Sequence, residues 1–497
     1  MCTSERSGKP TATEPAGGGN GEADNPGRRT FLAGAGLLAG AAGSALLPAC
    51  ASAPVPQAGT PGARLLLRGG TVLSMDAAVG DFDRADVLIE GDRIAAVGPT
   101  LAAADAQVID ATGMIVMPGF IDSHRHIWQG QLRNILPDGT LGDYLKSINT
   151  AARDIYRPED VHVGGLLSAW GALNAGITTL LDWSHVSSTP EHTEAAIRGL
   201  RDAGIRGVYA FGGGTPGPGM RHPEDLRRLR AQHFNSADQL LTLALAAGLN
   251  PAHWRVARDV GAPITVHANG AGQLLPLAAQ KALGPDLTYI HCCRLTDLEW
   301  SLIADTGGGI SMSAPVEMEM GHGVTPVQKV LDLKLPASLS NDVETSVGSD
   351  FFTQMRTVFL LQRMLAFQRQ QAGDKAAPAP MSARQVLQMA TIGGARVNRL
   401  EARTGSLTPG KQADVILLDA TRVNVMPLNN AWGAVVQAMD TSNVDTVFVA
   451  GRARKWKGQL VGVDLASLRR QAEASRDRIV AAAGWPRTAL GGYARGH

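Results

Sequence analysis

Apolar and polar positions alternate in short runs near both ends of the chain. Residues 64–73 and 86–98 combine β-branched and other apolar residues with Gly-containing turns, which predicts strands and a hairpin. Residues 413–419 and 444–452 repeat this pattern near the other end. Strands at both ends around a long middle predict a small β-sandwich formed by both termini. An amphipathic pattern predicts a last helix over residues 463–483.

Between these ends, short apolar runs alternate with segments of helical period, such as 193–203 and 297–306. This rhythm predicts parallel strands joined by helices, and eight strands are the number that a closed barrel needs. The chain therefore predicts an α/β fold with a (β/α)8 TIM barrel over residues 117–401, and sandwich parts at 64–116 and 402–497. The candidate strands are Gly119–His124, Ile177–Asp182, Gly207–Phe211, Leu241–Ala246, Ile264–His267, Leu287–Cys292, Gly309–Ser313 and Ala337–Asn341.

Composition narrows the classes of partner. The 497 residues include 46 basic and 45 acidic side chains, so the chain lacks the excess of positive charge that is typical of proteins that bind nucleic acid. Four cysteines in a chain of this length do not form a disulfide framework. Cys292 and Cys293 fall in a predicted strand, where buried thiols are the ordinary interpretation.

Residues 1–53 are interpreted as a signal and a disordered leader. Arg28 and Arg29 precede an apolar run, rich in Ala and Gly, that extends to Leu47; the segment resembles a twin-arginine export signal. The run is too short and too rich in small residues for a membrane span. Its end allows either lipidation at Cys50, the only predicted membrane contact, or cleavage that releases a soluble protein. The expected location is periplasmic or cell-surface; the alternative is an accidental arginine pair before an apolar linker.

Polar residues gather where the candidate strands end. The first strand ends in His124 and His126, which point the same way because side chains alternate along a strand. Other strand ends carry His267, His291 and Asp342. Singly, a strand-end histidine is usually structural and an aspartate after a strand usually caps a helix. Because the carboxyl ends of barrel strands share one rim, their agreement predicts a site for zinc or iron.

These motifs resemble those of the amidohydrolase superfamily. Residues 118–126 resemble the motif at which the chain enters the barrel in this superfamily. Residues 405–414 resemble the motif at which the chain returns from the barrel to the β-sandwich. Within the superfamily, residues 175–179 and 295–297 resemble the branch of cytosine deaminases and triazine hydrolases. The resemblance extends over residues 64–455.

The resemblance implies a metal-dependent hydrolase. We expect one divalent metal, because the fourth strand lacks the lysine that bridges two metals in binuclear members of the superfamily. Zinc is the first candidate and iron the second. Such a metal lowers the pKa of its water. Asp342 would then act as general base, and His291 would hydrogen-bond the oxygen where charge develops. The implied metal ligands are His124, His126, His267 and Asp342.

One position departs from the family pattern. Deaminases of this branch carry a glutamate three residues after the histidine of the fifth strand, where this chain has Gly270. Glycine transfers no proton, so ordinary purine or pyrimidine deamination is in doubt. We hypothesise that Glu317 or His322 supplies part of the proton transfer or binds a polar substrate group. The alternative is that Glu317 and Glu319 are solvated rim residues and His322 is a packing residue.

Further residues are candidates for substrate binding. Trp128 and Gln129 follow the histidine pair, and His185 follows the second strand; ordinary loop packing is their alternative. Glu344 is expected to brace a loop. The glycine run 212–214 lacks the lysine of a phosphate loop and carries no assignment.

The predicted function is hydrolysis of a carbon–nitrogen bond, amide-like or in a ring, of a small cyclic molecule by metal-activated water. Loss of the glutamate would be better tolerated with chloride or an ester oxygen as leaving group, which is the first alternative. A metal-dependent lyase or isomerase, or a non-catalytic binding protein, is the second, because fold does not fix function. The expected partner is a small-molecule substrate, and a homo-oligomer is left open.

Overall fold

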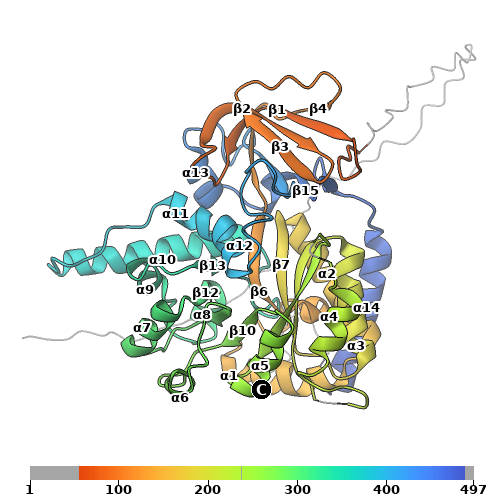
Figure 1. Ribbon diagram of the computed structural model, residues 1–497, viewed down its shortest axis with the longest axis vertical. Coiled ribbons are helices and arrows are strands. Elements are labelled where there is room, and N and C mark those ends of the chain that lie inside the picture. Colours follow the sequence, from red (N-terminus) through yellow and green to blue (C-terminus); the bar gives the residue numbers. More distant parts are fainter. Residues whose placement is uncertain (1–54, 216, 237, 487–497) are drawn as a thin grey trace, which may run out of the picture. The chain divides into compact units, whose positions relative to one another are not determined.

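The computed structural model describes residues 55–215, 217–236 and 238–486 (Figure 1). Arg28, Arg29 and Cys50 lie outside the described residues, so the export signal and the lipidation site stay predictions. Among the described residues, no helix has both the length and the hydropathy needed to span a membrane.

Eight parallel strands form the barrel, in the spatial order β13-β12-β11-β10-β9-β8-β7-β6. Each overlaps one of the predicted strands. Arg125 and Asp342 form an isolated parallel bridge that brings the last strand back to the first. The strands are β6 (Phe120–Arg125), β7 (Ile177–Ser184), β8 (Arg206–Phe211), β9 (Leu241–Ala247), β10 (Ile264–His267), β11 (Leu287–Ile290), β12 (Gly309–Met312) and β13 (Ala337–Leu339).

Helices follow the barrel strands, and some of them begin at a side-chain cap. In α7 (Asp297–Thr306), Thr296 and Glu299 form a capping box, and the left-handed Gly307 ends the helix. The sequence pattern did not predict α10 (Phe351–Gln371), whose buried side chains face the barrel. The other helices in this part are α1 (Leu141–Tyr144), α2 (Pro158–Asn174), α3 (Pro190–Ala203), α4 (Leu226–His233), α5 (Pro251–Asp259), α6 (Leu275–Ala279), α8 (Ala314–Glu319), α9 (Val327–Asp332), α11 (Ala383–Gln388) and α12 (Gly394–Val397).

Strands from both ends of the chain form one nine-stranded sheet, coloured orange and blue in Figure 1. The link is the antiparallel pairing of Val415 with Pro118 and of Asp419 with Met114. The predicted joining of the two termini is confirmed, and the strands belong to a single hydrogen-bonded sheet. They are β1 (Arg64–Leu73), β2 (Asp81–Glu90), β3 (Arg93–Gly98), β4 (Gln107–Asp110), β5 (Met114–Pro118), β14 (Val415–Asp419), β15 (Val444–Val449), β16 (Arg452–Trp456) and β17 (Gln459–Leu460).

Buried polar contacts attach this sheet to the barrel. Arg206, at the start of β8, donates two hydrogen bonds to Asp414, with lengths of 2.6 and 3.0 Å. Lys455 of β16 donates from Nζ to the carbonyl oxygen of Asn174, at the end of α2. The predicted last helix is α14 (Leu465–Ala482), which packs on α2. The sheet thus supports the barrel away from the carboxyl ends of its strands, whereas α14 also contacts the segment that follows β6.

Candidate active site

Five chemically active side chains meet at the carboxyl ends of the barrel strands. His124 lies near the end of β6, His267 is the last residue of β10, and His291 follows β11. Asp342 follows β13, and His126 follows β6. Parallel strands bring these positions to one rim, as the sequence predicted.

The ligand atoms of His124, His267, His291 and Asp342 all lie within 4.8 Å of one another. His126 adjoins this group, with Nε2 3.3 Å from Oδ1 of Asp342. The same oxygen is 3.1 Å from Nε2 of His124, and Oδ2 is 3.8 Å from Nε2 of His291. Asp342 is therefore the centre of the cluster. His291, expected only near the substrate, also belongs to the group of mutually close atoms.

The hydrogen bonds of two imidazole rings test whether the site suits a cation. Nδ1 of His126 donates to the carbonyl oxygen of Trp183 at 2.9 Å, and Nδ1 of His291 lies 3.1 Å from Oε1 of Glu317. A neutral imidazole carries one N–H, so Nε2 of each ring then has a free lone pair. Both Nε2 atoms face the carboxylate of Asp342, itself an acceptor. Hydrogen-bond acceptors that face one another repel, and a cation between them removes this repulsion. Imidazole nitrogens and a carboxylate oxygen are ligands that Zn²⁺ commonly takes in proteins.

Burial sets the charge state of the histidines. It lowers the pKa of His124 to about 3, an effect that neighbouring His126 reinforces, and it holds the pKa of His267 well below the ordinary value. Both rings are therefore neutral near pH 7 and can act as ligands. Burial would also lower the pKa of His291, but the Glu317 hydrogen bond and the charge of Asp342 outweigh it and raise that pKa. These two carboxylates thus favour positive charge on the His291 ring itself.

The backbone is strained at two of these positions. His291 has φ of 70° and Asp342 has φ of 59°, in the left-handed region that side chains other than Gly rarely adopt. Such strain persists only where the surrounding structure fixes it, and it concentrates at functional sites. Here it turns the side chains that follow β11 and β13 toward the centre of the barrel.

A buried ionic network holds the rim on which these ligands lie. Nε of Arg125 donates to Asp122 at 2.7 Å, and its Nη1 donates to Glu344 at 2.8 Å. Asp122 also accepts a hydrogen bond from the backbone N–H of Asn341 at 3.1 Å, and Arg133 donates to Glu344 at 3.0 Å. The expectation that Glu344 braces a loop agrees with this geometry. Arg125 was not among the predicted site residues, although an arginine between two histidines of the expected metal site is a usable signal.

A cavity of about 300 Å³ opens beside the cluster. Its lining includes His126, His267, His291 and Asp342. Among the described residues that line it there is no Lys or Arg, and Asp342 is the only carboxylate. Sequence reasoning missed its apolar wall, because these residues come from loops and short helices without a motif: Leu141, Tyr144, Leu145, Met320 and Val343.

The structure separates the predicted substrate-binding residues into two groups. His185 and His322 line the cavity. Trp128 and Gln129 are buried behind it: Trp128 packs against Tyr156 and His185, and the amide of Gln129 donates to the hydroxyl of Tyr144 at 2.7 Å. This packing favours a role for Trp128 and Gln129 in supporting the cavity wall, and their contact with substrate stays a prediction.

His322 lines the cavity outside the metal cluster. It is 3 % exposed, its ring lies 4.5 Å from that of His291, and neither ring nitrogen has a hydrogen-bond partner within the described part of the chain. Burial lowers its pKa to about 4, helped by His291, so the ring is neutral near pH 7. An unpaired buried imidazole is costly unless a ligand completes its hydrogen bonds.

Glu317 is not the rim residue that the alternative interpretation described. It is fully buried, lies behind His291 and is absent from the cavity lining, whereas Glu319 is exposed. It therefore does not reach a leaving group directly. At Gly270, an added Cβ would lie 2.9 Å from Oε1 of Gln273, so a neutral amide occupies the space beside the missing glutamate.

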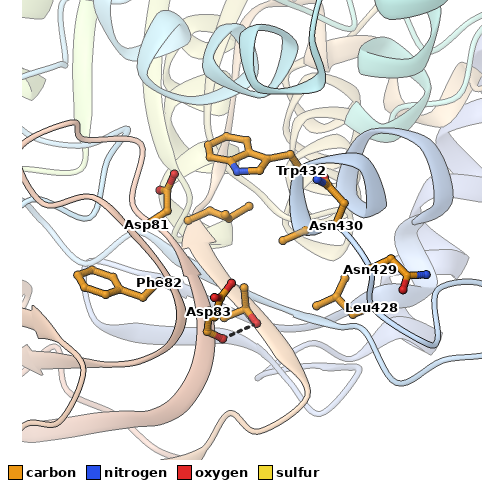
Figure 2. Close-up of a pocket in the computed structure, with 10 residues that line it drawn as sticks. Asp81, Phe82, Asp83, Leu428, Asn429, Asn430 and Trp432 are labelled. Atoms are coloured by element: carbon orange, nitrogen blue, oxygen red, sulfur yellow. Dashed lines mark hydrogen bonds between the residues drawn. The ribbon is translucent and has the colours of Figure 1, made fainter.

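A second cavity, of about 420 Å³, lies in the sheet part of the chain between β2 and the loop before Trp432 (Figure 2). The carboxylate of Asp81, which lines it, already has partners. Asp81 accepts a hydrogen bond from the backbone N–H of Ser74 at 3.0 Å and pairs with Arg384 at 3.4 Å. Arg384 also lies over the ring of Trp432, 4.8 Å from its centroid. We therefore place the chemistry at the barrel cavity.

The fold and the ligand cluster agree with a family model. Residues 115–454 match the model described as "Amidohydrolase family", which covers the whole barrel. The chain belongs to the amidohydrolase family. The predicted fold and enzyme class, a metal-dependent hydrolase acting on carbon–nitrogen bonds, are confirmed.

Curated relatives of this amidohydrolase carry the names of deaminases. A 5-methylthioadenosine/S-adenosylhomocysteine deaminase of Symbiobacterium thermophilum is 28% identical over 418 residues, covering 78% of this chain and 93% of the relative. A 5'-deoxyadenosine deaminase of Methanosarcina mazei is 26% identical over 441 residues, covering 84% of this chain and 99% of the relative.

Solved structures share the fold. An adenosine deaminase from Xanthomonas campestris with bound zinc has a TM-score of 0.74 at 22% identity, covering 85% of this chain and 100% of the other. A triazine hydrolase from Arthrobacter aurescens has a TM-score of 0.72 at 23% identity, covering 83% and 99%. At this identity the likeness concerns the architecture alone.

Proposed function

We propose that this amidohydrolase hydrolyses a ring carbon–nitrogen bond of a small, uncharged molecule with one zinc ion, or iron as the alternative. The observation that carries the proposal is the pair of imidazole Nε2 atoms, of His126 and His291, that face the carboxylate of Asp342. The names of the curated relatives support a substrate with a nitrogen heterocycle. The cavity supports an uncharged one, since Asp342 is the only charged group among its described lining residues.

His124, His126, His267 and Asp342 would hold the metal, with His291 beside them. When bound, a divalent metal makes water acidic enough to attack near neutral pH. Burial would raise the pKa of Asp342, but its contacts with the imidazoles of His124 and His126 hold this pKa well below the usual range. The carboxylate is therefore ionised and would accept the proton of the attacking water. The apolar side chains of Leu141, Met320 and Val343 limit the entry of other water molecules.

His322 would orient the substrate. Its two unpartnered ring nitrogens can donate one hydrogen bond and accept another in different directions, so one of them can pair with a polar group of the substrate ring. Because the ring is buried and neutral, this pairing would select uncharged ligands. The role is one of binding and orientation.

The experiment that tests the function begins with metal content per chain in purified protein lacking residues 1–53. We expect close to one zinc or iron per chain, and release of ammonia from heterocyclic amines when a panel is screened with this preparation. Absence of bound metal even after reconstitution would contradict the hydrolase mechanism and favour a binding protein.

A second candidate function rests on Gly270. Without a carboxylic acid at this position, a leaving group that departs as a stable anion is easier to expel than an amine. The neutral amide of Gln273 in the same space supports this alternative. Matched substrates that carry chloride, methoxy or amino groups on one heterocycle distinguish the two functions: faster release of chloride or methanol than of ammonia favours the second.

We also propose export by the twin-arginine route, on the basis of Arg28 and Arg29. Replacing both with Lys is expected to retain the protein in the cytoplasm, which cell fractionation measures. Unchanged secretion of the variant contradicts the proposal. Incorporation of labelled fatty acid into the wild type, lost in Cys50→Ala, would identify a lipoprotein.

A further inference from the structure

Glu317 is a fully buried carboxylate that contacts the cluster from behind, through the ring of His291. Its Oε1 accepts the backbone N–H of Ser313 at 2.8 Å and lies 3.1 Å from Nδ1 of His291. Its Oε2 accepts the hydroxyl of Thr325 at 2.6 Å. These partners come from the start of α8 and from the loop after it, so the carboxylate is fixed from two sides.

The hydrogen bond to Glu317 decides where His291 carries its proton. An ionised carboxylate only accepts, so Nδ1 of His291 must be the donor. In a neutral ring Nε2 then has the lone pair, and this atom faces Asp342 at 3.8 Å and the cavity. A carboxylate behind an imidazole commonly fixes the ring and raises its basicity at metal sites.

We propose that Glu317 is a positioning residue that holds His291 in the tautomer with Nδ1 protonated and Nε2 presented to the reaction centre. His291 then binds the cation or accepts a hydrogen bond, and it does not donate one to developing charge as the sequence analysis expected. Glu317 acts through His291 and not on the substrate. The proposal rests on the proposed function only in taking the cluster as the reaction centre.

Histidine tautomers can be measured without a substrate. In protein labelled with ¹⁵N-histidine and loaded with zinc, long-range ¹H–¹⁵N spectra distinguish a protonated Nδ1 from a protonated Nε2. The His291 signals are assigned by their loss in His291→Asn. We expect Nδ1 protonated in the wild type; a protonated Nε2 would overturn the proposal, whatever any variant does.

Two substitutions separate the acceptor oxygen from the negative charge. Glu317→Gln keeps an oxygen that can accept from both Ser313 and His291, while its amide N–H can face the Thr325 hydroxyl. We therefore expect the same tautomer as in the wild type. Glu317→Leu removes the acceptor, and we expect a protonated Nε2 or a mixture. Retention of the wild-type tautomer in a folded Glu317→Leu protein contradicts the proposal.

Zinc binding and turnover give independent readouts. Removing a supporting partner of a metal-binding histidine typically costs about 10- to 100-fold in metal affinity or activity. For Glu317→Gln we expect zinc to be held about 10-fold more weakly in chelator competition, and kcat to fall with KM unchanged, since Glu317 does not line the cavity.

The matched control is Glu319→Gln, an exposed neighbour. Equal zinc affinity in the two variants overturns the role of the charge. Failure to find a substrate leaves the tautomer and zinc results intact, so the two proposals fail separately.

Discussion

Arg125 donates to Glu344 across a distance of 2.8 Å in the interior of the protein, and so joins the first barrel strand to the loop after the last. Arg125 lies between His124 and His126, and Glu344 lies two residues beyond Asp342. The ion pair therefore connects the two chain segments from which most of the cluster comes. A contact away from the cavity thus helps to hold these two segments together.

Replacing Arg125 with Met tests this connection. The change leaves Asp122 and Glu344 without their shared buried partner, and breaking a buried ion pair in this way costs about 3–5 kcal/mol. Chemical unfolding should measure this loss. The control is Arg133→Met, whose side chain is 34% exposed and should matter less. Equal losses in the two variants would show that the barrel does not depend on Arg125.

Asp342→Asn should remove turnover almost completely. The amide retains the size of the side chain but cannot accept a proton, and general-base catalysis contributes about 10²- to 10⁴-fold. Steady-state rates on the substrate found in the screen measure the effect, with circular dichroism as the check on folding. Activity within about 10-fold of the wild type would exclude Asp342 as the base.

His322→Phe should weaken substrate binding without loss of metal. Phenylalanine fills similar space but offers no hydrogen bond, so KM should rise about 10-fold, as expected for one lost hydrogen bond of 1–1.5 kcal/mol. Metal content should stay as in the wild type. The exposed pair of His162 and Asp202 offers a control in His162→Phe. An unchanged KM would contradict substrate binding by His322 and favour the alternative that it is a packing residue.

The stability of the sheet part should depend on pH through Lys455. Burial lowers the pKa of Lys455 from 10.5 to about 8, against the pull of Asp445. Between about pH 8 and 10.5 the unfolded chain binds this proton and the folded chain does not, so stability gains a contribution that rises with pH. Unfolding titrations of wild type and Lys455→Met across this range should differ in slope above pH 8 and run parallel below it. Parallel curves throughout would contradict the shift.

Much of the barrel could be predicted because its strands are short, apolar and regularly spaced. Site residues at the strand ends could be predicted for the same reason, because His124, His267 and Asp342 lie at or directly after the ends of the predicted strands. The helix α10 was not predicted, because buried side chains on several faces hide its period. The positions of Glu317 and Trp128 relative to the cavity could not be predicted, because a sequence shows which residues follow a strand but not whether a loop turns them toward the cavity or behind it.

The pairing of β5 with β14 has a consequence for how the chain is made. During synthesis on the ribosome, β1–β5 emerge before the barrel. One edge of β5 stays unpaired until β14 has been synthesised, which happens only after the entire barrel. Throughout that time the nascent chain presents an open edge with apolar side chains, among them Ile115 and Met117, the kind of surface that pairs with other chains. Native structure can be completed only after translation has passed residue 419. Yield in the cell should therefore depend on chaperones that shield this edge, more than on the stability of the finished enzyme.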